Sequence, residues 1–257
     1  MQKIKLEYQH GKEVARIILD DSKGNILDHI MMEELQQVLD SFRENSNLKL
    51  ITIEGAGKHF SFGASVEEHQ KEYVAAMLHS FHNIFYTVRD LSIPTLAKVW
   101  GQCIGGGMEL ALTCNFLFAE SSAKLSQPEI SLGVFPPPAS ILLPLKIGYA
   151  RAEELLITGR AITAEEGKQK GFINEVYEDR DALEAALYVW IRKYILPKSA
   201  SSLRFSVKAA RVKFNHIIGN FLPTLEQMYV RGLMETNDAN EGIASFLEKR
   251  KPVWKNS

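Results

Sequence analysis

A short apolar strand, a glycine-containing loop and a helix follow one another twice in the first half of this 257-residue chain. The first copy spans residues 50–70. The second begins with the strand at 94–99, passes through Gly101–Gly107 and enters a helix at 108–113. Strands that alternate with helices are typical of a layered α/β core. The two copies lack the sequence identity that would mark a repeat protein, so we expect one core and not a solenoid.

The spacing of apolar residues predicts the remaining elements. A β-hairpin is expected over 3–20 and an amphipathic helix over 29–43. The stretch from Gln127 to Pro138 is expected to be a long, proline-rich loop. The chain thus divides into a β/α core over 1–195 and a helical section over 196–257. Further short strands are predicted at 116–119, 124–126 and 172–176, and further helices at 181–195, 199–217, 222–236 and 239–249.

Charge and cysteine content exclude several classes of partner. The 30 Lys and Arg residues nearly balance the 31 Asp and Glu residues, so no overall charge attracts nucleic acid or an acidic membrane. Cys103 and Cys114 form neither a disulfide framework nor a metal-binding spacing. No signal sequence and no run of about 18 apolar residues is found. We therefore predict a cytoplasmic protein without a metal, nucleic-acid or membrane partner.

The glycine triplet Gly105–Gly107, followed by Glu109, is the strongest local signal for chemistry. Glycines allow close approach of a ligand to the backbone, and the first N–H groups of the following helix have no internal acceptor. Such amides stabilise a developing negative charge, for example on an enolate oxygen. The alternative is a tight turn in which Glu109 only stabilises the helix start. A phosphate-binding P-loop or a dinucleotide fingerprint fits less well, because Leu110 stands where the latter needs glycine.

Two weaker signals accompany the triplet. Gly63 permits an unusual turn in the loop Phe60–Ser65, where the Ala64 amide is a candidate second donor. Glu129 follows the stiffening Pro128, although a single glutamate in a loop is ordinarily solvated. Taken with Glu109, it gives two carboxylates on rigid elements. Adding water across a double bond requires such a pair, one to accept a proton and one to supply it.

The segment Gly105–Gly133 resembles the signature of the enoyl-CoA hydratase/isomerase (crotonase) family, with Gln-Pro-Glu twenty residues after the first glutamate. Phe60–Glu68 resembles the oxyanion loop of this family, and Glu241–Lys251 resembles its C-terminal ending. The likeness runs nearly end to end in the same order. It implies a ClpP/crotonase-like spiral of ββα units with a helical C-terminal section.

The resemblance also implies roles for particular residues. The amides of Ala64 and Gly106 would form the oxyanion hole for a thioester carbonyl, and Glu109 and Glu129 would be the acid/base pair. Because many isomerases and hydrolases of the family lack one carboxylate, the presence of both favours hydration. Predicted substrate-binding residues include those lining the pantetheine channel and a lysine for the CoA phosphates: Gly63, Ser65, Val66, Glu67, Gly105, Pro137 and Lys249.

The expected partners follow from the same resemblance. The substrate is an acyl-CoA thioester, and coenzyme A enters as part of the substrate, so no separate cofactor is expected. Residues 196–257 would form a trimerisation region, giving a homotrimer or a hexamer made of two trimers.

Two features depart from family members that hydrate straight-chain substrates. Ser65 stands where those enzymes usually have Asp, and Pro136–Pro138 stand where they have a glycine-rich loop. Prolines fix the backbone and donate no N–H, so the acyl site should differ in shape, unless the loop has simply drifted. The combination of Phe60–His69 with Gly133–Pro136 resembles a subgroup of the family, the hydratases of cyclohexa-1,5-diene-1-carbonyl-CoA in anaerobic benzoyl-CoA degradation.

Several alternatives remain open on the sequence. A straight-chain enoyl-CoA hydratase or an enoyl-CoA isomerase would use the same fold. A non-catalytic acyl-CoA or RNA-binding scaffold would be favoured by the loss of a carboxylate or by a strongly basic helix, and neither is apparent. His79 and His82, three residues apart on a predicted helix, are weaker candidates for the acyl site, against surface or packing roles.

Overall fold

Two β-sheets form the centre of the protein, and the computed structural model describes all of residues 1–257. The main sheet has the strand order β1-β2-β3-β4-β6-β9, and only the β1–β2 hairpin is antiparallel. Its strands are β1 (Ile4–Gln9), β2 (Val14–Leu19), β3 (Leu50–Gly55), β4 (Thr95–Val99), β6 (Phe116–Glu120) and β9 (Glu175–Tyr177). The smaller sheet joins β5 (Gln102–Ile104), β7 (Lys124–Ser126) and β8 (Ile162–Thr163).

Successive strands enter different sheets and are then followed by a helix. β4 belongs to the main sheet and β5 to the smaller one, and α3 (Gly106–Thr113) comes next. β6 and β7 divide in the same way before a short 3-10 helix at Pro128–Leu132. The chain is therefore built of ββα units, as the resemblance implied, and the predicted α/β class is confirmed.

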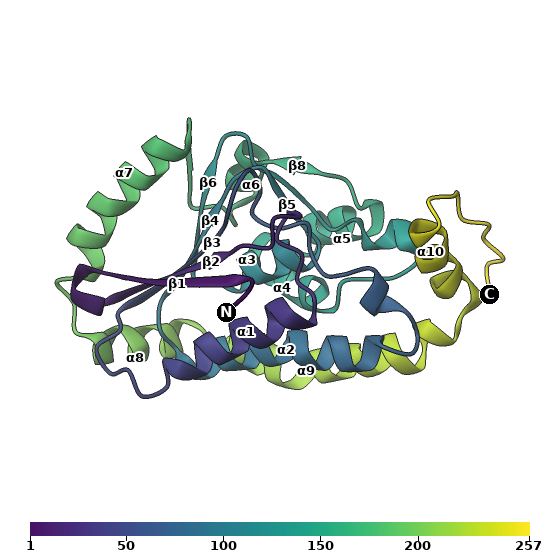
Figure 1. Ribbon diagram of the computed structural model, residues 1–257, viewed down its shortest axis with the longest axis horizontal. Coiled ribbons are helices and arrows are strands. Elements are labelled where there is room, and N and C mark those ends of the chain that lie inside the picture. Colours follow the sequence, from purple (N-terminus) through teal and green to yellow (C-terminus); the bar gives the residue numbers. More distant parts are fainter.

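Helices cover both faces of the main sheet. α1 (His29–Ser41), α2 (Val74–Leu91) and α9 (Val212–Arg231) form a layer along one side of the sheet, whereas α7 (Arg180–Trp190) lies on the opposite side (Figure 1). Adjacent residues of β3 point to different cores: Ile51 packs into the large core and Leu50 into the smaller cluster under α7. Burial on both faces explains the continuous apolar sequence of the parallel strands.

Five further helices complete the fold. They are α4 (Pro137–Ile147), α5 (Tyr149–Thr158), α6 (Ala164–Lys170), α8 (Ala200–Ala210) and α10 (Asn237–Leu247). α10 and the C-terminus lie at the end of the molecule remote from α7 (Figure 1). None of the helices combines the length and apolar character that a membrane span requires.

Two predictions of local structure were wrong. The segment from Gln127 to Pro138 is no simple loop, because Pro137 begins α4, and the first helical turn tolerates proline since its N–H groups have no internal acceptor. The predicted break at 218–221 is also absent, because α9 continues through Pro223. Ile218 and Leu222 are buried in the core, and this packing outweighs the cost of a proline within the helix.

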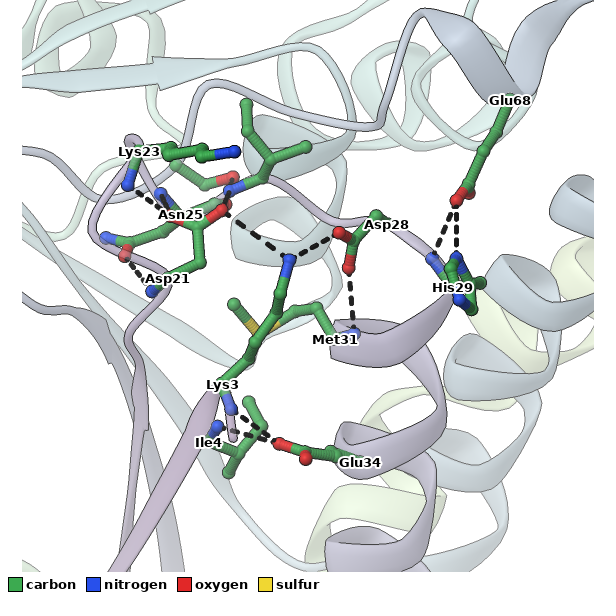
Figure 2. Close-up of polar contacts among 12 residues, drawn as sticks. Lys3, Ile4, Asp21, Lys23, Asn25, Asp28, His29, Met31, Glu34 and Glu68 are labelled. Carbon is green, nitrogen blue, oxygen red and sulfur yellow. Dashed lines mark hydrogen bonds and ion pairs between the residues drawn. The ribbon is translucent and has the colours of Figure 1, made fainter. Parts of the chain in front are cut away.

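A polar network fixes the N-terminal segment to α1 (Figure 2). Glu34 accepts hydrogen bonds from the backbone N–H groups of residues 2, 3 and 4 at 2.5, 2.8 and 3.0 Å. Asp28 caps α1 by accepting from the N–H of Met31 at 3.0 Å, and it also pairs with Lys3. The ring Nδ1 of His29 lies 2.9 Å from Oε1 of Glu68, in the 3-10 helix Glu67–His69 that follows the Ala64 loop. These contacts hold the 21–28 segment against the loop that carries Ala64.

Candidate active site

The loop around Ala64 is held by backbone hydrogen bonds on both sides of that residue. The N–H of Leu27 donates to the Gly63 carbonyl at 2.9 Å, and the N–H of Ser65 donates to the Leu27 carbonyl at 3.3 Å. Gly63 has a φ of 93°, a left-handed conformation that favours glycine. The N–H of Ala64 itself has no acceptor within the protein. The loop therefore presents one free, fixed donor.

The amide of Gly106 lies beside that of Ala64. Gly106 is the first residue of α3, and its N–H also lacks an acceptor within the protein. A Cβ placed on Gly106 would lie 3.1 Å from the Ala64 nitrogen, and one placed on Gly63 would lie 3.2 Å from the Gly106 nitrogen. Glycine is thus needed at both positions to let two free amides meet. The end of the Phe81 ring, 3.3 Å from the same Gly106 position, lines this space.

Glu109 is buried in the first turn of α3, with 4% of its surface exposed. Its Oε1 accepts a hydrogen bond from the N–H of Ala139 at 2.8 Å. Pro137 and Pro138 open α4 without N–H groups, so Ala139 supplies the first backbone donor of that helix. The prolines that were expected only to reshape a loop therefore direct a helix N-terminus at one carboxylate.

Glu129 reaches the same space from the 3-10 helix at Pro128–Leu132. Its Oε1 would lie 2.6 Å from a Cβ on Gly105, a residue whose φ of 52° already favours glycine. The buried Gln127 fixes the carboxylate, because with its amide nitrogen facing Glu129 it donates to both oxygens at 3.1 Å. Gly105 precedes Gly106, so Glu129 stands next to the paired amides.

Burial changes the protonation of both carboxylates. It raises the pKa of Glu129 to about 8. The pKa of Glu109 is raised well above its ordinary value by burial and then by the charge of Glu129, while the Ala139 N–H opposes this rise. Neither carboxylate forms an ion pair with a Lys or Arg side chain. The pair therefore retains a proton near neutral pH, which suits an acid and a base that act together.

The predicted catalytic residues Ala64, Gly106, Glu109 and Glu129 thus converge on one space, and Gly63 and Gly105 border it. Their chemical roles stay predictions. Most of the other predicted substrate-binding residues are near in the chain: Ser65 and Val66 continue from Ala64, exposed Glu67 begins the next 3-10 helix, and Pro137 is buried at the start of α4.

Lys249 is separate from these residues. It lies exposed just beyond the C-terminal end of α10, with a φ of 55°. No hydrogen bond or ion pair connects its side chain with the rest of the protein. Its proposed contact with the CoA phosphates stays a prediction.

Sequence reasoning missed other residues of the site. Tyr229 of α9 is buried, and the charges of Glu129 and Glu109 add to the effect of burial in raising its pKa. Ala139 lies 30 residues from its partner Glu109. No local pattern indicates either contact, whereas Gln127 was visible within the Gln-Pro-Glu motif.

His82 is buried and bonds to Glu226 at 2.6 Å. No group of three or more His, Cys, Asp or Glu side chains is placed to hold a metal.

Comparison with known proteins adds independent information. A family model described as enoyl-CoA hydratase/isomerase matches residues 9–257. A cyclohexa-1,5-dienecarbonyl-CoA hydratase from Thauera aromatica is 42% identical over 253 residues, which cover 98% of this chain and 97% of that protein. A probable enoyl-CoA hydratase from Rhizobium meliloti is 34% identical over 239 residues, 90% of each chain.

Solved structures agree with these matches. An enoyl-CoA hydratase from Bacillus anthracis aligns over 100% of both chains with a TM-score of 0.78 and 30% identity. One from Bacillus halodurans covers 95% of this chain and 99% of its own, with a TM-score of 0.88; its 20% identity makes it informative on fold alone. The predicted crotonase fold is confirmed. The chain belongs to the enoyl-CoA hydratase/isomerase (crotonase) family.

Proposed function

We propose that this protein is a hydro-lyase that adds water to a conjugated enoyl-CoA thioester, and that its substrate is cyclohexa-1,5-diene-1-carbonyl-CoA. The observation that carries the proposal is a pair of carboxylates with raised pKa values, one buried and one partly buried, beside two free backbone amides. The choice of acyl group rests on the 42% identity to a relative that is named for that substrate.

In the proposed reaction, the amides of Ala64 and Gly106 donate to the thioester carbonyl oxygen. One carboxylate of the Glu109–Glu129 pair takes a proton from water, and the water oxygen bonds to the ring β-carbon. The electron pair of that double bond moves onto the thioester, where the two amides stabilise the enolate. The carboxyl group that holds the pair's proton then protonates carbon.

For the cyclic diene, the proton is delivered to the far end of the conjugated system. The remaining double bond then lies next to the thioester, and the product is 6-hydroxycyclohex-1-ene-1-carbonyl-CoA. The Pro136–Pro138 segment supports a site of unusual shape, since it replaces a flexible loop by the rigid start of α4 against Glu109. Water is the only second reactant, and coenzyme A enters with the substrate, so no separate cofactor takes part.

The proposal extends to binding and assembly. Residues 64–67 line the channel for pantetheine, and Lys249 contacts the CoA phosphates. The section 196–257 joins the chains into a homotrimer, or a hexamer of two trimers, in the cytoplasm. Large apolar side chains exposed on this section support such an interface: Phe205, Val212, Phe221, Met228, Phe246 and Trp254.

The deciding experiment is an assay of the purified protein on linear and alicyclic enoyl-CoA thioesters with product identification. We expect kcat/KM for cyclohexa-1,5-diene-1-carbonyl-CoA to exceed that for crotonyl-CoA by about 10-fold or more, a difference that a shaped apolar site can supply. Equal or better turnover of crotonyl-CoA would instead identify a straight-chain hydratase. A product without the mass of an added water would identify an isomerase.

A further inference from the structure

Tyr229 has a buried hydroxyl group without a hydrogen-bond partner in the protein. Only 1% of the residue's surface is exposed. Buried polar side chains are nearly always paired, because an unpaired group has lost its bonds to water. An unpaired hydroxyl at a reactive site therefore suggests that its partner belongs to a bound molecule.

The position of Tyr229 connects it with both carboxylates. Its ring packs against Phe135 at a centroid distance of 5.3 Å, and Phe135 lies in the segment between Glu129 and Ala139. The helices α4 and α9 pack against each other. Tyr229 of α9 therefore lies on the helix that neighbours α4, whose Ala139 N–H donates to Glu109.

Neither carboxylate accepts a hydrogen bond from the Tyr229 hydroxyl, although the charges of both raise the pKa of this phenol. The group therefore stays protonated and keeps its O–H as a donor near neutral pH. A phenol held close to two carboxylates without bonding either can donate to a small oxygen group placed among the three.

We propose that Tyr229 binds the reacting oxygen: its hydroxyl donates to the water that is added, and afterwards to the hydroxyl group of the product. A water that donates both protons to the two glutamates still has lone pairs, so it can accept this bond and be oriented toward the alkene. This role rests on the proposed function, and it makes Tyr229 a substrate-contacting residue.

The test compares two ligands that differ in one hydroxyl group. Dissociation constants of 6-hydroxycyclohex-1-ene-1-carbonyl-CoA and cyclohex-1-ene-1-carbonyl-CoA are measured by calorimetry for the wild type and Tyr229→Phe. We expect the substitution to raise the dissociation constant of the hydroxylated ligand by about 10-fold and that of the other ligand by less than about 2-fold, as for the loss of one hydrogen bond. The rate of hydration should also fall by about 10-fold or more.

The controls separate contact from structure. Tyr86→Phe removes the hydroxyl group of a half-buried tyrosine on α2. Burial and the charge of Glu226 raise the pKa of Tyr86, whereas Glu109 and Glu129 do not contribute. This variant should therefore change the affinity for neither ligand. The Tm of Tyr229→Phe should not fall, because the lost hydroxyl has no partner in the protein. The same ratio of the two affinities in wild type and Tyr229→Phe would overturn the assignment. Wild-type protein that binds neither ligand would instead overturn the proposed function.

Discussion

The carboxylates in two regions of this protein have opposite surroundings. Under α7, Glu54 accepts hydrogen bonds from Arg16 at 3.0 and 2.5 Å and pairs with Lys98, whose side chain is 2% exposed. Lys98 also lies 2.5 Å from Glu184 of α7. In the active site, Glu109 is buried and Glu129 is partly buried, and neither has a cation beside it.

The difference separates a structural charge from a reactive one. The hydrogen bonds that Arg16 donates to Glu54 raise the pKa of Arg16, so the guanidinium group favours its charged form. Burial without a cation favours the protonated form of Glu109 and Glu129. A strong ion pair would keep a carboxylate charged and prevent it from exchanging protons. Glu109 and Glu129 therefore lack the stabilising ion pairs that Glu54 has under α7.

The largest expected effect tests the reactive side of this comparison. Glu109→Gln and Glu129→Gln should each lower kcat by roughly 10²- to 10⁴-fold, since each removes a proton acceptor or donor. Affinity for a saturated acyl-CoA should change little, because the paired amides remain. Steady-state kinetics and calorimetry measure both quantities. Unchanged kcat in either variant would remove that residue from the acid/base pair.

The same two variants also test the cost of the unpaired charges. Because each exchanges a carboxyl without a cation for a neutral amide, the Tm should stay level or rise. A clear fall in Tm in both variants would mean that these carboxylates hold the fold together as Glu54 does.

A smaller effect, on stability and not on turnover, is expected under α7. Glu54→Leu should lower the free energy of unfolding by about 3 kcal/mol, since it leaves Lys98 buried with a single partner. The double variant Glu54→Leu/Lys98→Met should recover most of this loss, because the charge of the buried lysine is then removed as well. Urea denaturation measures both, and kcat of the folded enzyme should match the wild type. A fall in kcat would connect the two regions.

The effect that is smallest for each single step of the experiment is a pH dependence of stability, because it builds up gradually over several pH units. The unfolded chain releases the Glu129 proton near the ordinary value of 4.5, whereas the folded protein releases it near 8. Between these values the folded state binds more protons, so stability falls as pH rises, by up to about 1.4 kcal/mol per pH unit for one carboxyl. Glu129→Gln should therefore gain stability relative to the wild type as pH increases through this window.

Urea denaturation at a series of pH values gives the two stability curves. The exposed Glu153 of α5 supplies a control, because Glu153→Gln should follow the wild type across the same range. Parallel curves for wild type and Glu129→Gln would show that Glu129 loses its proton at the same pH in both states.

Much of the framework was predictable because its signals are local. Glycine is needed at 105–107, where a Cβ would approach Glu129, Ala64 or Ser61, and Thr163 caps α6 by accepting from the N–H of Glu166, as the Thr-x-x-Glu pattern indicates. The strands β5 and β8 were missed, since three and two residues carry no clear periodicity. The start of the helix at 137–147 was not predicted, because the prolines at its first positions were interpreted as part of a loop.

The sequence by itself determined the alternation of strands and helices, the glycine turns and the presence of two glutamates in rigid settings. Only the tertiary structure decided that these glutamates share one buried space, that Ala139 holds Glu109, and that Tyr229 joins them from α9. The physical reason is the separation along the chain between the residues that interact. Periodicity and turn preferences act between neighbours, whereas burial, charge coupling and hydrogen bonding depend on which distant segments pack together.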